Sequence, residues 1–297
     1  MPTSSSRSKL ILGIVLSCLL ACALCLSGCG SSASNTDSNA SSATDAQVHL
    51  VTPGTITVGS DCDYPPFIQM TKGQPNGFEY DLIKDVCDKL GYKLQYLNPQ
   101  NFDSLIPAVA SGTKMDIAIS SFTINDERKK TIDFCIPYFD SNQACVVKDS
   151  SSYKTAKDLD GATVCAQSGT TGAQWVQENL PNATLQNLNN ATDCMSALEA
   201  NKVQACFIDQ PTAAAYVAKQ YKDCKVLQAI PTGEQYGFVI SKSNPALKAQ
   251  INQALVDLYK DGTAAKLFKQ YFGNSIKPPV EMGELPTNAQ EGSVQDL

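Results

Sequence analysis

The chain has 297 residues, of which 43% are hydrophobic and 18% are charged. This composition suits a globular protein of one large or two modest domains and excludes disorder except in local segments. The formal net charge of −6 argues against a nucleic acid or an anionic lipid surface as partner.

The N-terminus has the pattern of a secretory signal. Arg7 and Lys9 precede an apolar and small-residue run at 10–26, which is too short and wrongly flanked for a membrane-spanning helix. The run ends in LSGC, which resembles the lipobox of bacterial lipoproteins and implies cleavage before Cys29 and a lipid on its thiol. A plain signal peptide cut elsewhere would leave Cys29 without a role. We expect a signal peptide at 1–28 and an extracytoplasmic protein that is lipid-anchored to the bacterial cell membrane.

Residues 29–50 are expected to form a disordered tether. The stretch at 30–46 has no apolar residue larger than alanine, so nothing offsets the entropy of ordering it. The single histidine of the chain, His49, lies at the end of this segment. Loss of the signal removes two positive charges, which takes the net charge from −6 to −8.

From residue 55 onward, short apolar runs alternate with amphipathic segments. The first unit has predicted strands at 55–60, 92–97 and 115–120 and predicted helices at 77–91 and 103–112. Alternation of strand and helix predicts a largely parallel sheet that helices cover on both faces.

The same pattern returns after residue 150. The second unit has predicted strands at 162–167 and 203–209 and predicted helices at 169–179 and 192–202. Two β-like connectors at 136–148 and 231–242 join the units, and helices at 244–262 and 263–273 follow. The residues beyond 276 lack periodicity and are interpreted as a mobile tail.

Eight of the twelve cysteines lie outside the signal and the lipobox. An even number outside the cytosol permits disulfides, whereas Cys87 on an apolar helix face and Cys165 and Cys206 within strands suit small core thiols. Both interpretations stay open. The sequence has no CxxC pair and no histidine cluster, so we expect neither a metal nor a cofactor.

Polar residues gather where predicted strands end, which is where parallel α/β sheets bind ligands and where helix N-termini present free backbone donors. These residues are Asp61 and Tyr64 after the first strand, Ser120, Ser121, Thr123 and Arg128 after the third, Gln167, Thr170 and Thr171 after the fourth, and Asp209 at the end of 203–209.

Each of these stretches also has a purely structural interpretation. Thr123 and Asp126 match a capping box, and Thr170 or Thr171 could cap the following helix. Asp209 precedes Pro211 by two residues, as a helix N-cap does.

The set as a whole nevertheless matches a free amino acid. Arg128 with hydroxyl and backbone donors suits a carboxylate, and an acid from another strand suits an ammonium group. Tyr64 alone, before two prolines, could be only the wall of a rigid turn.

Residues 55–273 resemble the extracellular amino-acid-binding proteins of ABC importers, solute-binding protein family 3. SDCDYPPF, GFEYDLIKDVCDKLG, LIPAVASGTKMDIAISSFTINDERKKTIDFCIPY, QSGTTG and YKDGTAAKLFKQYFG carry the resemblance in order. It implies a periplasmic-binding-protein-like (type II) α/β fold with two α/β lobes joined by two hinge strands. Lobe 1 would comprise 51–140 and 232–273, and lobe 2 would comprise 141–231, with 274–297 as the tail.

The resemblance also implies roles by motif position. Arg128 would clamp the ligand carboxylate with Thr123 and with Thr171 from the opposite lobe, and Asp209 with Ser121 would hold the α-ammonium. Tyr64 would pack on the ligand side chain. The remaining members of the expected set are Asp61, Ser120, Gln167 and Thr170.

Some residues depart from the family pattern and leave the side-chain preference open. Phe102 stands where the family often has tryptophan, and Asp63 adds a second acid to the first loop. An acidic side chain that faces the cleft favours a ligand whose own side chain ends in a cation or an amide donor. We therefore expect lysine, arginine or ornithine ahead of glutamine and cystine, with glutamate and aspartate disfavoured.

The expected function is a monomeric receptor that hands a polar amino acid to an ABC permease. One alternative is an enzyme, because dehydratases of prephenate or arogenate resemble this family. Such chemistry needs a general acid or base in the cleft, whereas the one histidine lies by the tether. A second alternative is the ligand-binding module of a sensor.

Overall fold

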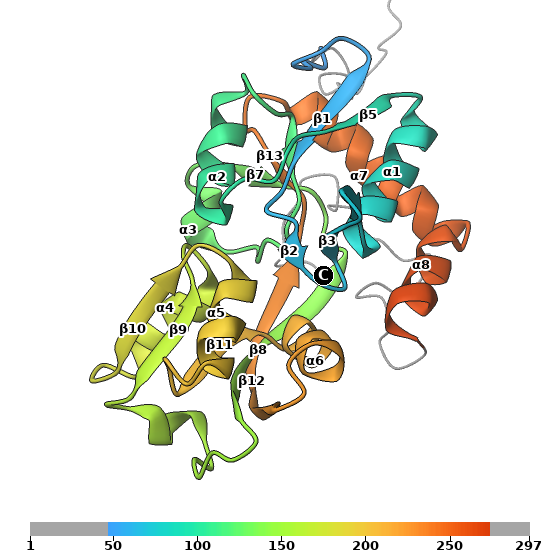
Figure 1. Ribbon diagram of the computed structural model, residues 1–297. Helices are drawn as coiled ribbons and strands as arrows, with labels where there is room; N and C mark the ends of the chain where they lie inside the picture. The colour runs from blue at the N-terminus through green and yellow to red at the C-terminus, as the bar shows by residue number, and fades with distance from the viewer. Residues whose placement is uncertain (1–46, 274–297) are drawn as a thin grey trace, which may run out of the picture. The chain divides into compact units, whose positions relative to one another are not determined.

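Two five-stranded sheets organise residues 47–273, the part of the chain that the computed structural model describes (Figure 1). The lobe 1 sheet has the order β5-β1-β6-β13-β7 and consists of β1 (Thr55–Gly59), β5 (Lys93–Tyr96), β6 (Ile117–Ala118), β7 (Asp133–Phe134) and β13 (Val239–Ile240). The lobe 2 sheet has the order β10-β9-β11-β8-β12 and consists of β8 (Phe139–Lys148), β9 (Thr163–Gln167), β10 (Thr184–Leu188), β11 (Ala205–Asp209) and β12 (Cys224–Tyr236).

The parallel part of each sheet is the part that the alternating pattern predicts. In lobe 1, β1 runs parallel to β5 and β6, and in lobe 2, β9 runs parallel to β10 and β11. The antiparallel strands are β13 in lobe 1 and β8 and β12 in lobe 2. These strands belong to the segments that carry the chain between the lobes, so their direction follows from the crossing.

Helices cover the sheets as predicted. Lobe 1 has α1 (Phe78–Leu90), α2 (Phe102–Ser111), the short α3 (Asp126–Lys129), α7 (Pro245–Lys260) and α8 (Thr263–Phe272). Lobe 2 has a 3-10 helix (Ala156–Leu159), α4 (Thr171–Asn179), α5 (Ala191–Glu199) and α6 (Gln210–Lys219). The expected end of α1 is confirmed, because Gly91 adopts the left-handed conformation that glycine accommodates at a helix C-terminus.

The two hinge strands pair with each other where the lobes meet. Strands β8 and β12 are antiparallel, and Tyr236 lies opposite Phe139 at the lobe 1 end. After β12 the chain turns at Gly237 into β13. A Cβ atom at Gly237 would lie 3.0 Å from the Cys135 carbonyl oxygen. The connector expected at 231–242 therefore contains two strands, because its first part extends the lobe 2 sheet and its last part enters the lobe 1 sheet.

The sequence patterns did not predict several short elements. A small antiparallel sheet consists of β2 (Asp63–Tyr64), β3 (Ile68–Thr71) and β4 (Gln74–Asn76), and these strands are too short for a period of two to be visible. Edge strand β10 is largely exposed and lacks the apolar run that marked β9 and β11.

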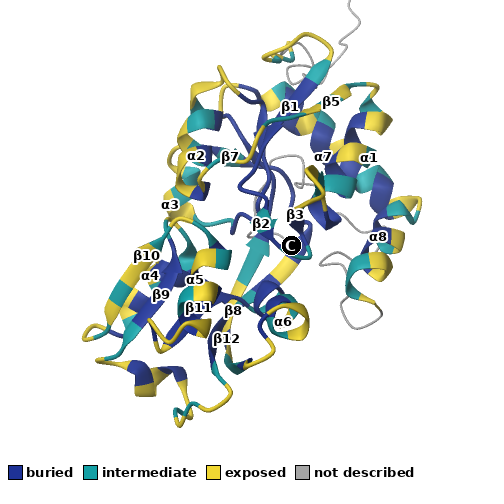
Figure 2. Cartoon of the chain, viewed as in Figure 1, coloured by how far each residue is buried: buried dark blue, intermediate teal, exposed yellow. Residues whose placement is uncertain are grey.

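The buried side chains continue from one lobe into the other (Figure 2). Aromatic rings connect the hinge to lobe 1: the Phe67 ring centroid lies 4.7 Å from that of Phe139 and 5.3 Å from that of Tyr236. Phe139 also stacks on Phe268 of α8 at 5.8 Å. These contacts hold the lobe 1 ends of both hinge strands in a packed aromatic core.

Within residues 47–273, no helix combines the length and hydrophobicity needed to cross a bilayer. The predicted signal, the lipobox and the expected tail at 274–297 lie outside the described residues. The eight cysteines from Cys62 to Cys224 are all buried free thiols. Of the two interpretations, disulfides or core thiols, the described residues therefore agree with core thiols.

Candidate functional site

A small pocket lies between the lobes, beyond the carboxyl ends of β9 and β11. The structure brings together nine of the ten predicted ligand-binding residues in its lining, with Phe102 as the further member: Tyr64, Ser120, Ser121, Thr123, Arg128, Gln167, Thr170, Thr171 and Asp209. The tenth, Asp61, lies behind them and accepts hydrogen bonds from Ser120 and Gln167.

Arg128 is held over two stacked rings at the mouth of lobe 1. The Phe102 and Phe122 centroids are 4.5 Å apart, and the guanidinium carbon lies 5.5 and 5.4 Å from them. One guanidinium nitrogen donates to the Thr123 carbonyl at 2.8 Å, and the other donates across the cleft to the Gly169 carbonyl at 3.1 Å. Burial lowers the Arg128 pKa to about 10, so the group stays cationic at neutral pH.

The capping box expected at Thr123 and Asp126 is wrong. Helix α3 begins after Asn125, whose side chain accepts a hydrogen bond from the Arg128 backbone at 2.8 Å. Since Asn125 supplies the cap, the Thr123 side chain is free to face the cleft.

Thr123 and Thr171 meet from opposite lobes around a carboxylate that the sequence analysis did not single out. Their hydroxyl oxygens are 3.4 Å apart. Both hydroxyls donate to one carboxylate oxygen of Glu234 on β12, at 2.9 Å from Thr123 and 3.2 Å from Thr171. The two hydroxyls thus already hold a carboxylate group, as they would hold that of a ligand.

Asp209 ends β11 and stands at the N-cap position of α6, but its side chain does not cap that helix. Its two carboxylate oxygens accept hydrogen bonds from Gln143 and Tyr236, which are hinge residues. Its backbone N–H donates to the Tyr64 hydroxyl at 3.2 Å. Burial, followed by the charge of Glu234, raises the Asp209 pKa to about 7.

Ser121 donates its hydroxyl proton to lobe 1 and also lines the pocket. Both its backbone N–H and its hydroxyl donate to Glu79 Oε1, at 2.7 and 2.9 Å. Its backbone has φ 52°, a left-handed conformation that is uncommon for serine. These bonds fix the loop on α1, while the hydroxyl oxygen keeps lone pairs that can accept, so its role beside Asp209 stays a prediction.

Asp61 forms a buried hydrogen-bonded group with Ser120 and Gln167. Ser120 donates to one carboxylate oxygen at 2.8 Å, and Gln167 from lobe 2 donates to the other at 2.9 Å. Burial raises the Asp61 pKa to about 6, and these two hydrogen bonds oppose the shift. The Gln167 side-chain carbonyl oxygen is buried without a hydrogen-bond partner, so it can accept from a donor in the pocket.

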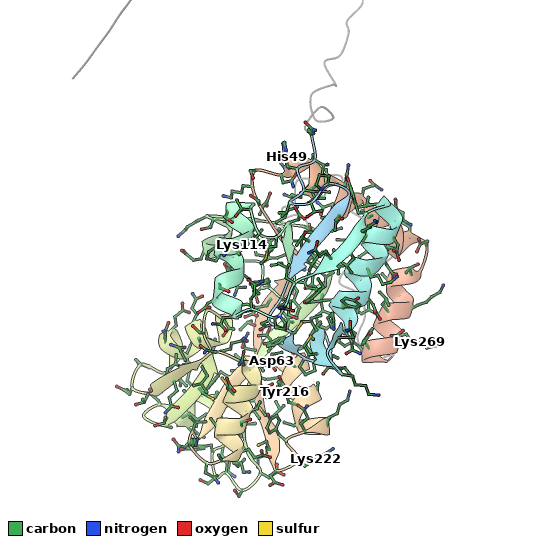
Figure 3. The ribbon with its side chains drawn as sticks, turned by 45° about the horizontal axis from the view of Figure 1, so that its top comes forward. His49, Asp63, Lys114, Tyr216, Lys222 and Lys269 are labelled. Atoms are coloured by element: carbon green, nitrogen blue, oxygen red, sulfur yellow. The ribbon has the colours of Figure 1, made fainter. Side chains whose placement is uncertain are left out.

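Asp63 lies at the lobe junction instead of in the pocket lining. One of its carboxylate oxygens accepts from the Thr192 backbone N–H at 2.7 Å, in the first turn of α5. Tyr216 donates to the Asp63 backbone carbonyl at 2.9 Å, and the two residues lie close together in Figure 3. His49 lies at the far end of lobe 1 from this junction (Figure 3).

The N-terminus of α4 approaches the hinge closely. Thr170 caps this helix by accepting from the Ala173 N–H at 3.2 Å, so its structural interpretation is confirmed although it also lines the pocket. A Cβ atom at Gly172 would lie 2.8 Å from Gln143 Oε1 and 3.2 Å from the Phe207 carbonyl oxygen. Glycine is therefore needed for Thr171 to reach the hinge residues.

Gln143 and Glu234 are the cleft residues that sequence reasoning missed. Both lie on hinge strands, in connectors that were assigned only a linking role. The polar run at 140–143 in a segment that crosses between the lobes is the signal that could have found Gln143.

Comparison with known proteins places the chain among binding proteins. The model of the bacterial extracellular solute-binding proteins, family 3, matches residues 56–274. The L-cystine-binding protein TcyJ of Escherichia coli strain K12 is 29% identical over 226 residues, which cover 75% of this chain and 84% of that protein.

Two solved structures show the same fold. An ancestral arginine-binding protein bound to arginine has a TM-score of 0.71 and 37% identity, covering 74% of this chain and 99% of the other. The ancestral amino acid-binding protein AncCDT-1, described as a precursor of cyclohexadienyl dehydratase, has a TM-score of 0.69 and 36% identity, covering 74% and 96%. The chain belongs to family 3 of the bacterial extracellular solute-binding proteins.

Proposed function

We propose that the protein is a receptor for a cationic amino acid, which it captures by closure of its lobes and delivers to an ABC permease. The observation that carries the ligand preference is the charge of the cleft. One guanidinium, Arg128, lies near the carboxylates of Asp209 and Glu234, and a third carboxylate, Asp61, lies behind the pocket lining. The known relatives include proteins named for cystine and arginine, so the family accommodates different side chains.

The main-chain groups of the ligand would occupy the clamp between the lobes. The α-carboxylate would take the place of the Glu234 carboxylate on the Thr123 and Thr171 hydroxyls, beside Arg128. The α-ammonium would pair with Asp209, whose neighbours Gln143 and Tyr236 already orient the carboxylate. Each charged group of the ligand would then meet a charge of opposite sign.

The ligand side chain would run towards Asp61. The α-carboxylate and α-ammonium of the ligand would neutralise Arg128 and Asp209. Asp61 and Glu234 would then remain without a cation. Gln167 adds an unpartnered carbonyl oxygen next to Asp61, so this end of the pocket offers acceptors. A guanidinium or ammonium satisfies such a set, whereas a second ligand carboxylate would meet like charge.

Closure is supported by the contacts that cross between the lobes. Besides Thr123 with Thr171, the pairs are Asp61 with Gln167, Asp63 with Thr192, Tyr64 with Asp209 and Arg128 with Gly169. A ligand that touches both lobes adds contacts that only the closed arrangement provides, and it therefore shifts the population towards closure.

The remaining parts of the proposal rest on sequence and on family. The pattern at 10–29 supports a lipoprotein held at the outer side of the cell membrane as a monomer, and family membership supports an ABC permease as partner. The likeness to AncCDT-1 keeps enzyme activity as the second candidate. Against enzyme activity, the carboxylates of Asp61 and Asp209 each accept two hydrogen bonds that orient them, as suits groups that anchor a ligand.

A thermal-shift panel of the amino acids tests the ligand class. Arginine, lysine or ornithine should give the largest stabilisation, glutamine and cystine less, and glutamate none. Glutamate or an aliphatic amino acid giving the largest shift would refute the cationic preference. Incubation with prephenate is the matching test for an enzyme, because turnover would favour the second candidate.

A further inference from the structure

Three cysteines from separate elements of lobe 2 direct their sulfur atoms to one place. Cys165 lies on β9, Cys194 on α5 and Cys206 on β11, and we call them the thiol trio. Their sulfur atoms all lie within 4.8 Å of one another, and the three side chains are at most 1% exposed. Within residues 47–273, this is the one group of potential metal ligands that meets in this way.

The local fold explains why the sulfurs converge. Cys165 and Cys206 are direct register partners on neighbouring parallel strands, so their side chains leave the sheet on the same face. Helix α5 packs on that face, and the Cys165 thiol donates to the Cys194 carbonyl at 3.4 Å. The trio is thus built from two paired strands and the helix that packs on them.

The geometry suits a three-coordinate metal ion. A metal–sulfur bond of about 2.3 Å places three sulfurs of a trigonal site about 4.0 Å apart, which is compatible with the separations here. Sulfur-only donors select soft ions such as Cu(I), and the hard ions that prefer carboxylates and water are disfavoured.

The trio lies next to the cleft. Cys194 and Cys206 line a small second pocket. Tyr64, Gln167 and Asp209 line both this pocket and the candidate amino-acid site. Two of the three thiols are therefore close to the interface between the lobes.

We propose that Cys165, Cys194 and Cys206 form a binding site for a thiophilic monovalent metal ion of the Cu(I) class. The site is separate from the amino-acid function and does not depend on it. Binding exchanges S–H bonds for S–metal bonds, and the displaced protons go to solvent without any change of oxidation state. The expectation of no metal rested on the absence of closely spaced cysteines, whereas these three come together only in the fold.

The test is a Cu(I) competition with bathocuproine disulfonate, using the full chain in detergent, reduced with a phosphine under nitrogen. Wild type should withdraw one more equivalent of Cu(I) than the triple variant C165A/C194A/C206A. The matched control is Cys145→Ala, a buried thiol that packs in a different cluster on the same sheet and whose loss should leave the copper count unchanged. Comparison of variants cancels the contribution of all other thiols, including Cys29.

Equal copper counts for wild type and the triple variant would overturn the proposal, as would an equal loss in Cys145→Ala. A disulfide within the trio in protein purified without reductant, found by alkylation and mass spectrometry, would overturn it too. If the triple variant does not fold, the single variant Cys194→Ser replaces it, and its Cu(I) affinity should fall by more than about tenfold. X-ray absorption on copper-loaded wild type should show three sulfur ligands, and nitrogen or oxygen ligands would contradict the site.

Discussion

Replacement of Asp61 by asparagine tests the cationic-ligand proposal most directly. The Asp61→Asn variant keeps the size of the side chain and can still accept from Ser120, but it removes the negative charge. The new amide group would face the Gln167 amide nitrogen, which now donates to Asp61 at 2.9 Å. Gln167 can turn its unpartnered carbonyl oxygen towards the new amide, which gives up the bond from its nitrogen to the Asn189 carbonyl at 3.1 Å. The variant should therefore fold, with the loss of the charge as its main change.

The expected magnitude follows from the burial of the pair. Asp61 is 6% exposed, so water screens little of its attraction to a distal cation. Two charges about 4 Å apart attract by about 4 kcal/mol at an effective dielectric constant of about 20, and losing one partner of such a buried pair costs about 2 to 5 kcal/mol. Arginine affinity should fall by about 2 to 4 kcal/mol, or roughly 30- to 700-fold. Glutamine, which has no charge at this end, should lose less than about tenfold.

The assay is isothermal titration calorimetry with arginine and with glutamine at pH 7.5, where Asp61 is ionised. Asp63→Asn is the matched control, since it removes the same charge two residues away. Asp63 binds Thr192 across the lobe junction, so its loss should weaken both ligands by the same factor. An unchanged ratio of arginine to glutamine affinity in Asp61→Asn would refute the placement of the ligand side chain at Asp61.

Four further predictions concern the clamp, the buried acids and the anchor. Arg128→Ala should cost about 2 to 5 kcal/mol of amino-acid affinity with little change in melting temperature, and an unchanged dissociation constant would assign Arg128 a surface role. Arginine affinity should rise from pH 5 to 7.5, and binding should release protons. The pKa values of Asp61 and Asp209 without ligand are about 6 and 7, and a bound cation favours the ionised form of both carboxylates. An affinity that does not change with pH in calorimetry would contradict this. Burial raises the Glu79 pKa from 4.5 to about 7, so Glu79 should contribute up to about 3 kcal/mol to the loss of unfolding free energy as pH rises through that range. Asp61 and Asp209 add to the loss in the same direction, so urea unfolding of Glu79→Gln should show a loss smaller by that amount than wild type. Cys29→Ser should release the protein from membranes, and its retention in the membrane fraction would refute lipidation at Cys29.

Several features could be read from local sequence because local physics decides them. The period of the apolar residues in α1 and the glycine at its end specify that helix without any other part of the chain. Strands β1, β9 and β11 are short apolar runs followed by polar residues. Parallel pairing of β1 with β6 in lobe 1 and of β9 with β11 in lobe 2 brings the polar residues of each sheet to one edge. Residues from both edges line the pocket.

Other features needed the tertiary structure because they depend on partners distant in sequence. The Ser121 hydroxyl proton could be donated to many groups, and only the position of Glu79 on α1 shows where it goes. Glu234 reaches Thr123 and Thr171 because the return hinge strand passes between the lobes. The loop motif around Thr123 contains no information on which carboxylate will arrive from 111 residues away.

The sequence by itself thus determined the α/β units and the polar residues that gather after the strand ends. Tertiary structure decided which polar groups line the pocket and which bind other protein groups, and it brought Cys165, Cys194 and Cys206 together from β9, α5 and β11. The physical reason is the range of the forces involved. Periodicity and capping act within a few residues of chain, whereas hydrogen-bond partners and sulfur contacts depend on how distant segments pack.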